Sequence, residues 1–184
     1  MNDEKFIRYL TNTIMLLKKQ AIKAKRNSDN PKDGLKDYAQ GVIMGYYSII
    51  TLLKHQAFAF CMDQKELGLA DIKPDVDLLD LHRNPDIDFE EDNWAIDVMN
   101  EEKIKGYLID SIKLLKEQAI EAKKGAANPK EGSEEYSKGE ALAYYTVIST
   151  LKNQAPFYDL EQKDVGLDDI DPDADLLGLY KRDK

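Results

Sequence analysis

The amino-acid sequence predicts an all-α protein in which a helical hairpin followed by a short C-terminal helix is duplicated in tandem. The line YAQGVIMGYYSIITLLKHQA at residues 38–57 returns as YSKGEALAYYTVISTLKNQA at residues 136–155. Apolar residues in and before these lines recur at spacings of three and four, the period of a helix with one buried face. One hairpin alone cannot bury such faces, so we expect the two copies to pack as a pseudo-twofold four-helix arrangement.

The duplication extends well beyond these two lines. A shift of 98 residues aligns Asn2 with Asn100 and continues without a gap to Arg83 and Lys181. Roughly half of the aligned positions are identical, and a segment repeated in this way is normally one structural unit that packs against its copy.

Residues 84–99, NPDIDFEEDNWAIDVM, belong to neither copy. We interpret them as a linker between a first hairpin repeat, residues 1–83, and a second repeat, residues 100–184. The start of the linker is acidic and contains proline, as linkers often do. Its end carries apolar side chains that are costly to leave in water, so we expect that end to pack on the body of the protein. These side chains are Trp94, Ile96 and Val98.

The first helix of each copy is predicted from one apolar stripe, which in the first copy lies between about Asp3 and Lys25. The stripe consists of Phe6, Leu10, Ile14, Leu17, Ala21 and Ala24, and in the second copy of Ile104, Leu108, Ile112, Leu115, Ala119 and Ala122. Asn2 and Asn100 are suited to cap these helices, and the acids that follow them match the positive helix start. The basic run KKQAIKAKR suits the negative end, which favours dipole compensation over a nucleic-acid site.

A second long helix is predicted after the segments NPKDG and NPKEG, where proline and glycine turn the chain. Its stripe consists of Tyr46, Ile50, Leu53 and Ala57, and in the second copy of Tyr144, Ile148, Leu151 and Ala155. Gly41 and Gly139 lie inside this helix, although glycine costs about 1 kcal/mol there relative to alanine. Their presence in both copies predicts a close helix crossing or, alternatively, a ligand contact.

Each copy closes with an acidic segment, LGLADIKPDVDLLDL and VGLDDIDPDADLLGL. Alternating acids suggest calcium, but an EF-hand loop needs glycine at its sixth position and glutamate at its twelfth. The second segment has Ala174 and Tyr180 at these positions. Pro74 and Pro172 indicate instead the first residue of a short helix with acids in its first turn. We therefore predict two short helices and no calcium loop.

The charge of the chain limits its partners. Its 184 residues include 35 acids and 26 bases, which gives a formal net charge of −9. A surface of this sign opposes binding to a phosphate backbone, so we expect no nucleic-acid partner. It suits a basic protein partner, and simple solubility is the alternative explanation.

Targeting and redox signals are few. Cys61 is the single cysteine, so no internal disulfide can form and a reducing compartment fits best. The N-terminal line MNDEKFIRYLTNTIMLLKKQ lacks the basic start and apolar run of a signal peptide. No apolar stretch is long enough to span a bilayer. We expect a cytoplasmic protein without a membrane partner.

Motifs of an enzyme or a metal centre are sparse. His55 and His82 are the only histidines, and neither has a second histidine at metal-ligand spacing on a helix. The sequence contains no glycine-rich phosphate loop, no nucleophile elbow and no CxxC motif. We therefore expect no catalytic residues, no metal and no cofactor.

Several glycines and polar residues recur at equivalent positions of the two copies. The candidate ligand- or partner-binding residues are Tyr38, Gly41, Tyr47, Gln56, Tyr136, Gly139, Tyr145 and Gln154. One interpretation is that they line a groove between the hairpins. The other is that the rings and amides are buried in the core with their polar groups bonded.

These observations favour a non-enzymatic acidic interaction protein that binds another protein through an exposed helical face. An immunity or antitoxin protein that blocks a basic partner electrostatically is one concrete form. The alternative is a small-ligand-binding protein that uses a Tyr- and Gln-lined groove between the hairpins. An enzyme with carboxylate chemistry ranks last.

Overall fold

The computed structural model describes residues 3–81 and 100–178, and within them every regular element is helical, as predicted. Four long helices form the body: α1 (Asp3–Asp29), α2 (Lys36–Ala59), α4 (Glu101–Ala127) and α5 (Glu134–Gln154). The short helices are α3 (Pro74–Asp77), η2 (Ala155–Tyr158), η3 (Gln162–Val165) and η4 (Pro172–Leu177). The predicted cap Asn2 and the predicted linker, residues 84–99, lie outside the described residues.

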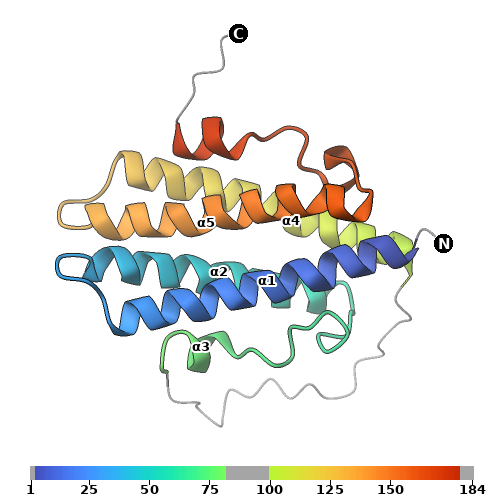
Figure 1. Cartoon of the computed structure of the whole chain (residues 1–184), viewed down its shortest axis with the longest axis horizontal. Helices are drawn as coiled ribbons and strands as arrows, with labels where there is room; N and C mark the ends of the chain where they lie inside the picture. The colour runs from blue at the N-terminus through green and yellow to red at the C-terminus, as the bar shows by residue number, and fades with distance from the viewer. Residues whose placement is uncertain (1–2, 82–99, 179–184) are drawn as a thin grey trace.

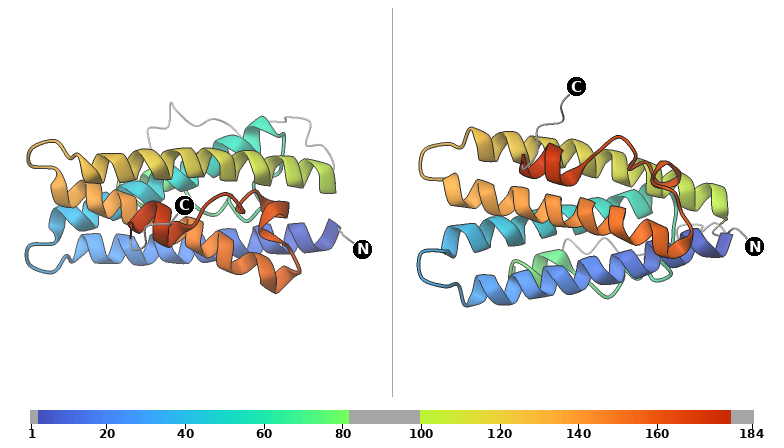
Figure 2. Two further views of the ribbon diagram at one scale, coloured as in Figure 1. Left: turned by 90° about the horizontal axis from the view of Figure 1, so that it is seen from above. Right: turned by 45° about the horizontal axis from the view of Figure 1, so that its top comes forward.

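The four long helices lie side by side, and the α1–α2 and α4–α5 turns are at the same end of the bundle (Figure 1). The segment after α2, which contains α3, runs along the outside of α1 and α2. The segment after α5, which contains η4, runs along the outside of α4 and α5 on the opposite side of the molecule (Figure 2). Among the described elements, α2 and α5 pack against each other most extensively.

The predicted apolar stripes form the core, and every residue of the four stripes is buried. Ile14 of α1 and Ile112 of α4 are 2% and 1% exposed. The segments after α2 and α5 also contribute, because Leu69 and Leu167 are fully buried. These segments are therefore part of the packed body, and their apolar burial helps to hold them there.

The predicted turn and cap signals place the ends of the long helices. The Asn100 side chain accepts a hydrogen bond from the backbone N–H of Lys103 at 2.9 Å, so it caps α4 as predicted. Gly34 and Gly132 have φ of 78° and 77° in the two turns. Glycine adopts this left-handed conformation without the steric cost of a Cβ atom.

The first helix is longer than its apolar stripe predicts, because α1 continues past Lys25 to Asp29. Lys25 pairs with Asp29 one turn later and with Asp80 of the segment after α2, at 2.7 Å. These pairs favour a helical last turn in α1.

The two second helices end differently. α2 continues to Ala59, whereas α5 ends at Gln154 and the chain enters the 3-10 helix η2. Pro156 explains the difference, because it lacks the N–H that would continue the helical hydrogen bonds. In η2 the side chain of Phe157 is 79% exposed.

Pro74 and Pro172 are the first residues of α3 and η4, as predicted. The side chain of Asp171, just before η4, accepts hydrogen bonds from the backbone N–H groups of Asp173 and Ala174. An acid in this place satisfies N–H groups that have no partner inside the helix.

Candidate functional site

Gly41 of α2 and Gly139 of α5 lie where these helices cross, each against the backbone of the other helix. A Cβ atom added to Gly41 would lie 1.9 Å from the carbonyl oxygen of Tyr136. One added to Gly139 would lie 2.1 Å from the carbonyl oxygen of Tyr38. No side chain fits at these distances, so only glycine permits the approach.

The close contact continues one turn further along. A Cβ atom on Gly45 of α2 would lie 2.5 Å from the Cβ atom of Ala143 in α5. Small residues spaced by four, Gly41 with Gly45 and Gly139 with Ala143, give each helix a flat strip where the backbones meet. This geometry fills the space that a ligand would need and supports close packing as the role of the two candidate glycines.

Tyr38 and Tyr136 bring their carbonyl groups to the crossing and keep their rings half-buried. Burial raises the pKa of both phenols. The carboxylate of Glu135 raises the pKa of Tyr38 further, and that of Glu140 raises the pKa of Tyr136. Burial also raises the pKa of the Glu140 carboxyl group. This part of the interface therefore disfavours negative charge.

Tyr46 and Tyr144 form a polar layer deeper in the α2–α5 interface. Burial raises the pKa of each phenol to about 12, and hydrogen bonds with Thr146 and Ser48, respectively, lower it in part. Tyr144 also donates a hydrogen bond to the side-chain carbonyl of Gln118 in α4 at 3.1 Å. The bonds satisfy hydroxyl groups that burial removes from water.

Tyr47 and Tyr145 face the segments that follow their own helices. Tyr47 donates to the carboxylate of Asp75 at 2.9 Å, and Tyr145 donates to that of Asp173 at 2.8 Å. Each hydrogen bond is the leading cause that raises the pKa of its phenol. Both carboxylates are exposed, so these pairs lie on the outside of the bundle.

Gln56 and Gln154 are half-buried near the C-terminal ends of α2 and α5. From Gly41 to Gln56 a helix rises about 22 Å. The structure therefore brings Tyr38, Gly41, Tyr136 and Gly139 together at one crossing, and it places the other four candidate residues elsewhere.

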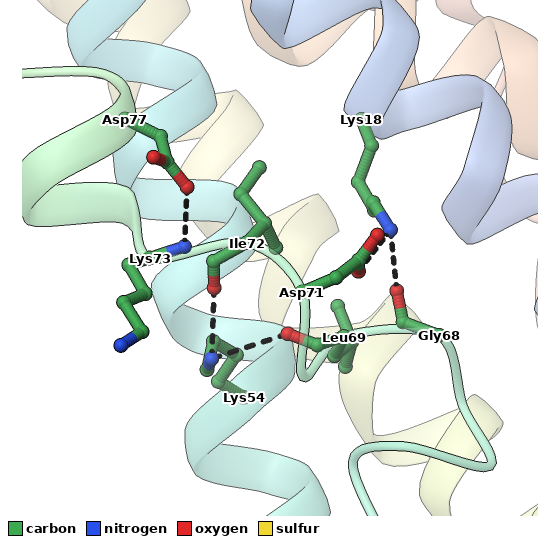
Figure 3. A network of polar contacts seen from close by, with 8 residues as sticks. All are labelled: Lys18, Lys54, Gly68, Leu69, Asp71, Ile72, Lys73 and Asp77. Carbon is green, nitrogen blue, oxygen red and sulfur yellow. Dashed lines mark hydrogen bonds and ion pairs between the residues drawn. The ribbon is translucent and has the colours of Figure 1, made fainter.

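Lysines hold the segment after α2, residues 63–81, which we name the first tail (Figure 3). Lys18 of α1 donates a hydrogen bond to the carbonyl oxygen of Gly68 at 2.8 Å and pairs with Asp71. The ammonium group holds the pKa of Asp71 below its usual range. Lys54 of α2 donates to two further carbonyl oxygens, at 3.1 Å and 2.9 Å, those of Leu69 and Ile72.

The segment after α5, residues 161–178, is held by the equivalent lysines, and we name it the second tail. Lys116 donates to the carbonyl oxygen of Gly166 at 2.8 Å and pairs with Asp169 at 2.6 Å. Lys152 donates to the carbonyl oxygen of Ile170. The recurrence of these lysines at aligned positions was the sequence signal that could have identified them as functional residues. A sequence does not show which carbonyl groups a lysine binds.

Two buried tyrosines that are not among the candidate residues join the hairpins. Tyr9 of α1 donates to the carbonyl oxygen of Leu151 in α5 at 2.9 Å. Tyr107 of α4 donates to the carbonyl oxygen of Leu53 in α2 at 3.1 Å. Burial raises the pKa of both phenols well above the usual value. A shift of 98 residues aligns Tyr9 with Tyr107, and this repetition in the sequence was the signal that could have found them.

A small cavity of about 10 Å³ lies beside Tyr107 at the centre of the bundle. Its walls include Leu53, Leu151 and the buried residues Thr13 and Ser111. A space of this size holds at most one water molecule. It is far smaller than the pockets that bind small organic ligands, which measure roughly 300–1,000 Å³.

In the described ranges, 3–81 and 100–178, no three His, Cys, Asp or Glu side chains gather as metal ligands would. None of the helices in the same ranges is long and apolar enough to cross a membrane. Comparison of the chain with protein-family models, with curated proteins and with solved structures finds no match.

Proposed function

We propose that the chain is a non-enzymatic interaction protein that binds a basic protein partner through its two acidic tails. The location of the charge carries this proposal. The first tail has six acids and two bases, and the second tail has seven acids and one base. The whole chain has a net charge of −9, so the excess of acids in the two tails is as large as that of the entire chain.

Hydrogen bonds hold the two acidic tails in place on the helix bundle. Lys18 and Lys54 bind the backbone of the first tail, and Lys116 and Lys152 bind that of the second. A surface that is already ordered loses less conformational entropy when a partner binds. This arrangement supports recognition of a folded or helical basic surface.

An inhibitor of a basic protein, of the immunity or antitoxin kind, is one concrete form of this function. Complementary charge accelerates the encounter of two proteins and disfavours partners of the same sign. A cytoplasmic location, and the absence of nucleic-acid, membrane and cofactor partners, belong to the same proposal.

The small-ligand alternative has less support, because the cavity at the centre of the bundle has a volume of only about 10 Å³. The carboxylate-enzyme alternative has less still. The second-tail acids Asp169, Asp171 and Asp173 already bond to a lysine, to backbone N–H groups and to a tyrosine.

We also propose that the fold is a tandem duplication, with repeats at residues 1–83 and 100–184 joined by a linker at residues 84–99 and packed about a pseudo-twofold axis. Equivalent contacts in the two halves support this. The hydrogen bonds of Tyr9 and Tyr107 are one example, since each joins a first helix to the second helix of the other hairpin. An experimental structure in which the two halves fail to superpose would contradict the duplication.

Affinity capture with paired baits tests the function. The full chain is compared with the variant Glu66→Lys/Asp168→Lys, which changes one exposed acid in each tail outside the lysine contacts. A basic protein held in stoichiometric amount by the parent chain and lost by this variant supports the proposal. Recovery of that protein should also fall as salt increases.

The matched control is Glu117→Lys/Glu121→Lys, which makes the same change of net charge on the exposed face of α4. This control should still capture the partner. Equal capture by all three baits contradicts a role for the tails. A small molecule that co-purifies with the parent chain would favour the ligand-binding alternative.

A further inference from the structure

One face of α1 is basic, whereas the two tails are acidic. Between Arg8 and Arg26, six exposed residues fall within an arc of about 100° on this helix, and we name them the α1 stripe. The exposed acid Glu4 lies in the same arc at the start of the helix. The residues of the α1 stripe are Arg8, Met15, Lys19, Ile22, Lys23 and Arg26. Met15 and Ile22 are 43% and 44% exposed, so the stripe combines four positive charges with two accessible apolar side chains.

The positive charges of the α1 stripe have no partner within the described part of the chain. None of its four basic side chains forms a salt bridge with a carboxylate of residues 3–81 or 100–178. Lys18 and Lys25 do pair, with Asp71 and Asp80 of the first tail. They lie on a neighbouring side of α1, so the first tail runs beside the stripe and leaves it open.

The fold does not require this basic face. Lys19 and Lys23 align with Glu117 and Glu121 on α4, where the helix packs equally well. The sequence predicts dipole compensation for the basic run that contains Lys19 and Lys23, but α1 continues to Asp29. The helix dipole favours basic residues only in the last turn, and these two lysines precede it. Packing and the helix dipole therefore leave the charges of Lys19 and Lys23 unexplained, whereas Arg26 lies in the last turn.

We infer that the α1 stripe is a docking surface for the second tail of another copy of this chain. The second tail has seven acids and one base, and its Leu177 is 41% exposed. Its charge and its accessible apolar side chain both complement the stripe. Lys116 and Lys152 hold this tail on α4 and α5, on the opposite side of the bundle from the first tail (Figure 2). The contact is therefore between copies.

This inference rests on the proposed function in one respect, which is that the second tail acts as an acidic docking surface. The contact joins two different surfaces, so it is heterologous: one copy keeps its second tail available and the other keeps its α1 stripe available. Exposed charge pairs are individually weak and are screened by salt. The association is therefore reversible and strongest at low ionic strength. A basic partner that binds the second tail competes with it.

Sedimentation velocity of the full chain over a concentration series tests the inference. At low ionic strength the average mass should rise with concentration above the 21.0 kDa of one chain. It should return to that value in about 1 M salt, where the Debye length is about 3 Å. The variant Lys19→Glu/Lys23→Glu should lower the association constant by about tenfold or more.

That variant introduces the residues that α4 carries at the equivalent positions, so the helix should fold, which circular dichroism checks. The control Lys113→Glu/Lys124→Glu makes the same change of net charge on exposed positions of α4 and should leave the association unchanged. Asp168→Lys changes the other half of the contact and should weaken association as well.

A parent chain that stays at 21.0 kDa at low salt and high concentration overturns the inference. So does an association that survives both Lys19→Glu/Lys23→Glu and Asp168→Lys. The same unchanged mass is expected if another part of the same chain occupies the α1 stripe, and this too contradicts docking between copies. Capture of a basic partner by Lys19→Glu/Lys23→Glu would leave the proposed function standing, since that variant has unchanged tails.

Discussion

The hydroxyl group of Tyr9 in α1 donates a hydrogen bond to the carbonyl oxygen of Leu151 in α5, 142 residues later in the chain. The Tyr9 ring is fully buried, so neither group can exchange this bond for one with water. Tyr107 makes the corresponding bond to Leu53. Together they connect each first helix to the second helix of the other hairpin, across the centre of the bundle.

Replacement of Tyr9 by phenylalanine should therefore destabilise the fold by about 1–3 kcal/mol, because the buried carbonyl loses its donor while the ring stays packed. Urea unfolding measures the change. Tyr47→Phe is the matched control, since its partner Asp75 is exposed, and it should stay within about 0.5 kcal/mol. Equal effects of the two substitutions would contradict the buried bond.

Alkaline pH should destabilise the protein before any buried tyrosine ionises in the folded state. Burial raises the pKa of Tyr46 and Tyr144 to about 12 from 10.0, and it also raises those of Tyr9 and Tyr107. Above pH 10 the unfolded chain loses these protons and the folded chain keeps them, so the unfolded state binds fewer protons and stability falls as pH rises.

The free energy of unfolding should therefore receive the full contribution of these four phenols below pH 10 and lose it progressively as pH rises to about 12 and beyond. Urea unfolding at a series of pH values measures the decline. Phenolate absorbance provides the independent check. If all tyrosines of the folded protein titrate together near pH 10.0, these hydroxyl groups are not buried and the prediction is wrong.

Gly41→Ala should destabilise the protein by about 1–3 kcal/mol or more, since α2 and α5 must separate to accept one methyl group. Its Cβ atom would lie 1.9 Å from a backbone oxygen of Tyr136. Gly125→Ala is the control, because nothing lies within 4 Å of a Cβ atom there. Alanine at that exposed helical position should stabilise the fold by up to about 1 kcal/mol. Thermal and urea unfolding measure both.

A Gly41→Ala protein that melts like the parent but no longer binds a partner would reverse the packing interpretation. It would place Gly41 in a binding surface, and the same test applies to Gly139, whose Cβ atom would lie 2.1 Å from the carbonyl oxygen of Tyr38.

Lys116→Met should loosen the second tail without unfolding the bundle. The ammonium group binds the Gly166 carbonyl and the Asp169 carboxylate, and methionine keeps the apolar stem while it removes both bonds. Amide hydrogen exchange in residues 161–178 should accelerate by about tenfold, which corresponds to about 1.4 kcal/mol of local stability. Lys113→Met, at an exposed position of the same helix, should leave the exchange unchanged.

The same contact predicts an acid-sensitive tail. Lys116 lowers the pKa of Asp169 below 3.8, so this carboxylate stabilises the folded state above the unfolded pKa. The contribution is lost as pH falls through the lower folded pKa.

Calcium titration should leave the melting temperature unchanged and show no stoichiometric binding by calorimetry. The acids that alternate in the second tail already serve other groups: Asp169 pairs with Lys116, Asp171 accepts backbone N–H groups, and Asp173 accepts the Tyr145 hydroxyl. Calcium needs several of these oxygens at once. Tight binding would show that the tail rearranges around a metal.

The sequence by itself determined the helices, the turns and the buried faces, because these depend on local properties of the chain. A stripe such as Leu10, Ile14 and Leu17 can be read from its spacing, and all three residues are buried. Gly34 and Gly132 mark turns because only glycine adopts their positive φ at no steric cost. The cap Asn100 and the helix starts at Pro74 and Pro172 follow from equally local rules.

Only the tertiary structure decided what these elements meet. The sequence shows Gly41 and Gly139 as glycines inside predicted helices, which is unusual. The backbone oxygens that exclude a side chain at each of them belong to the other half of the chain. Tyr9, Lys18 and Lys54 each donate to backbone carbonyl groups, which are the same for every residue type and leave no mark on a sequence. Local spacing determines a helix and its buried face, whereas the choice among distant carbonyl groups depends on how the packed helices cross.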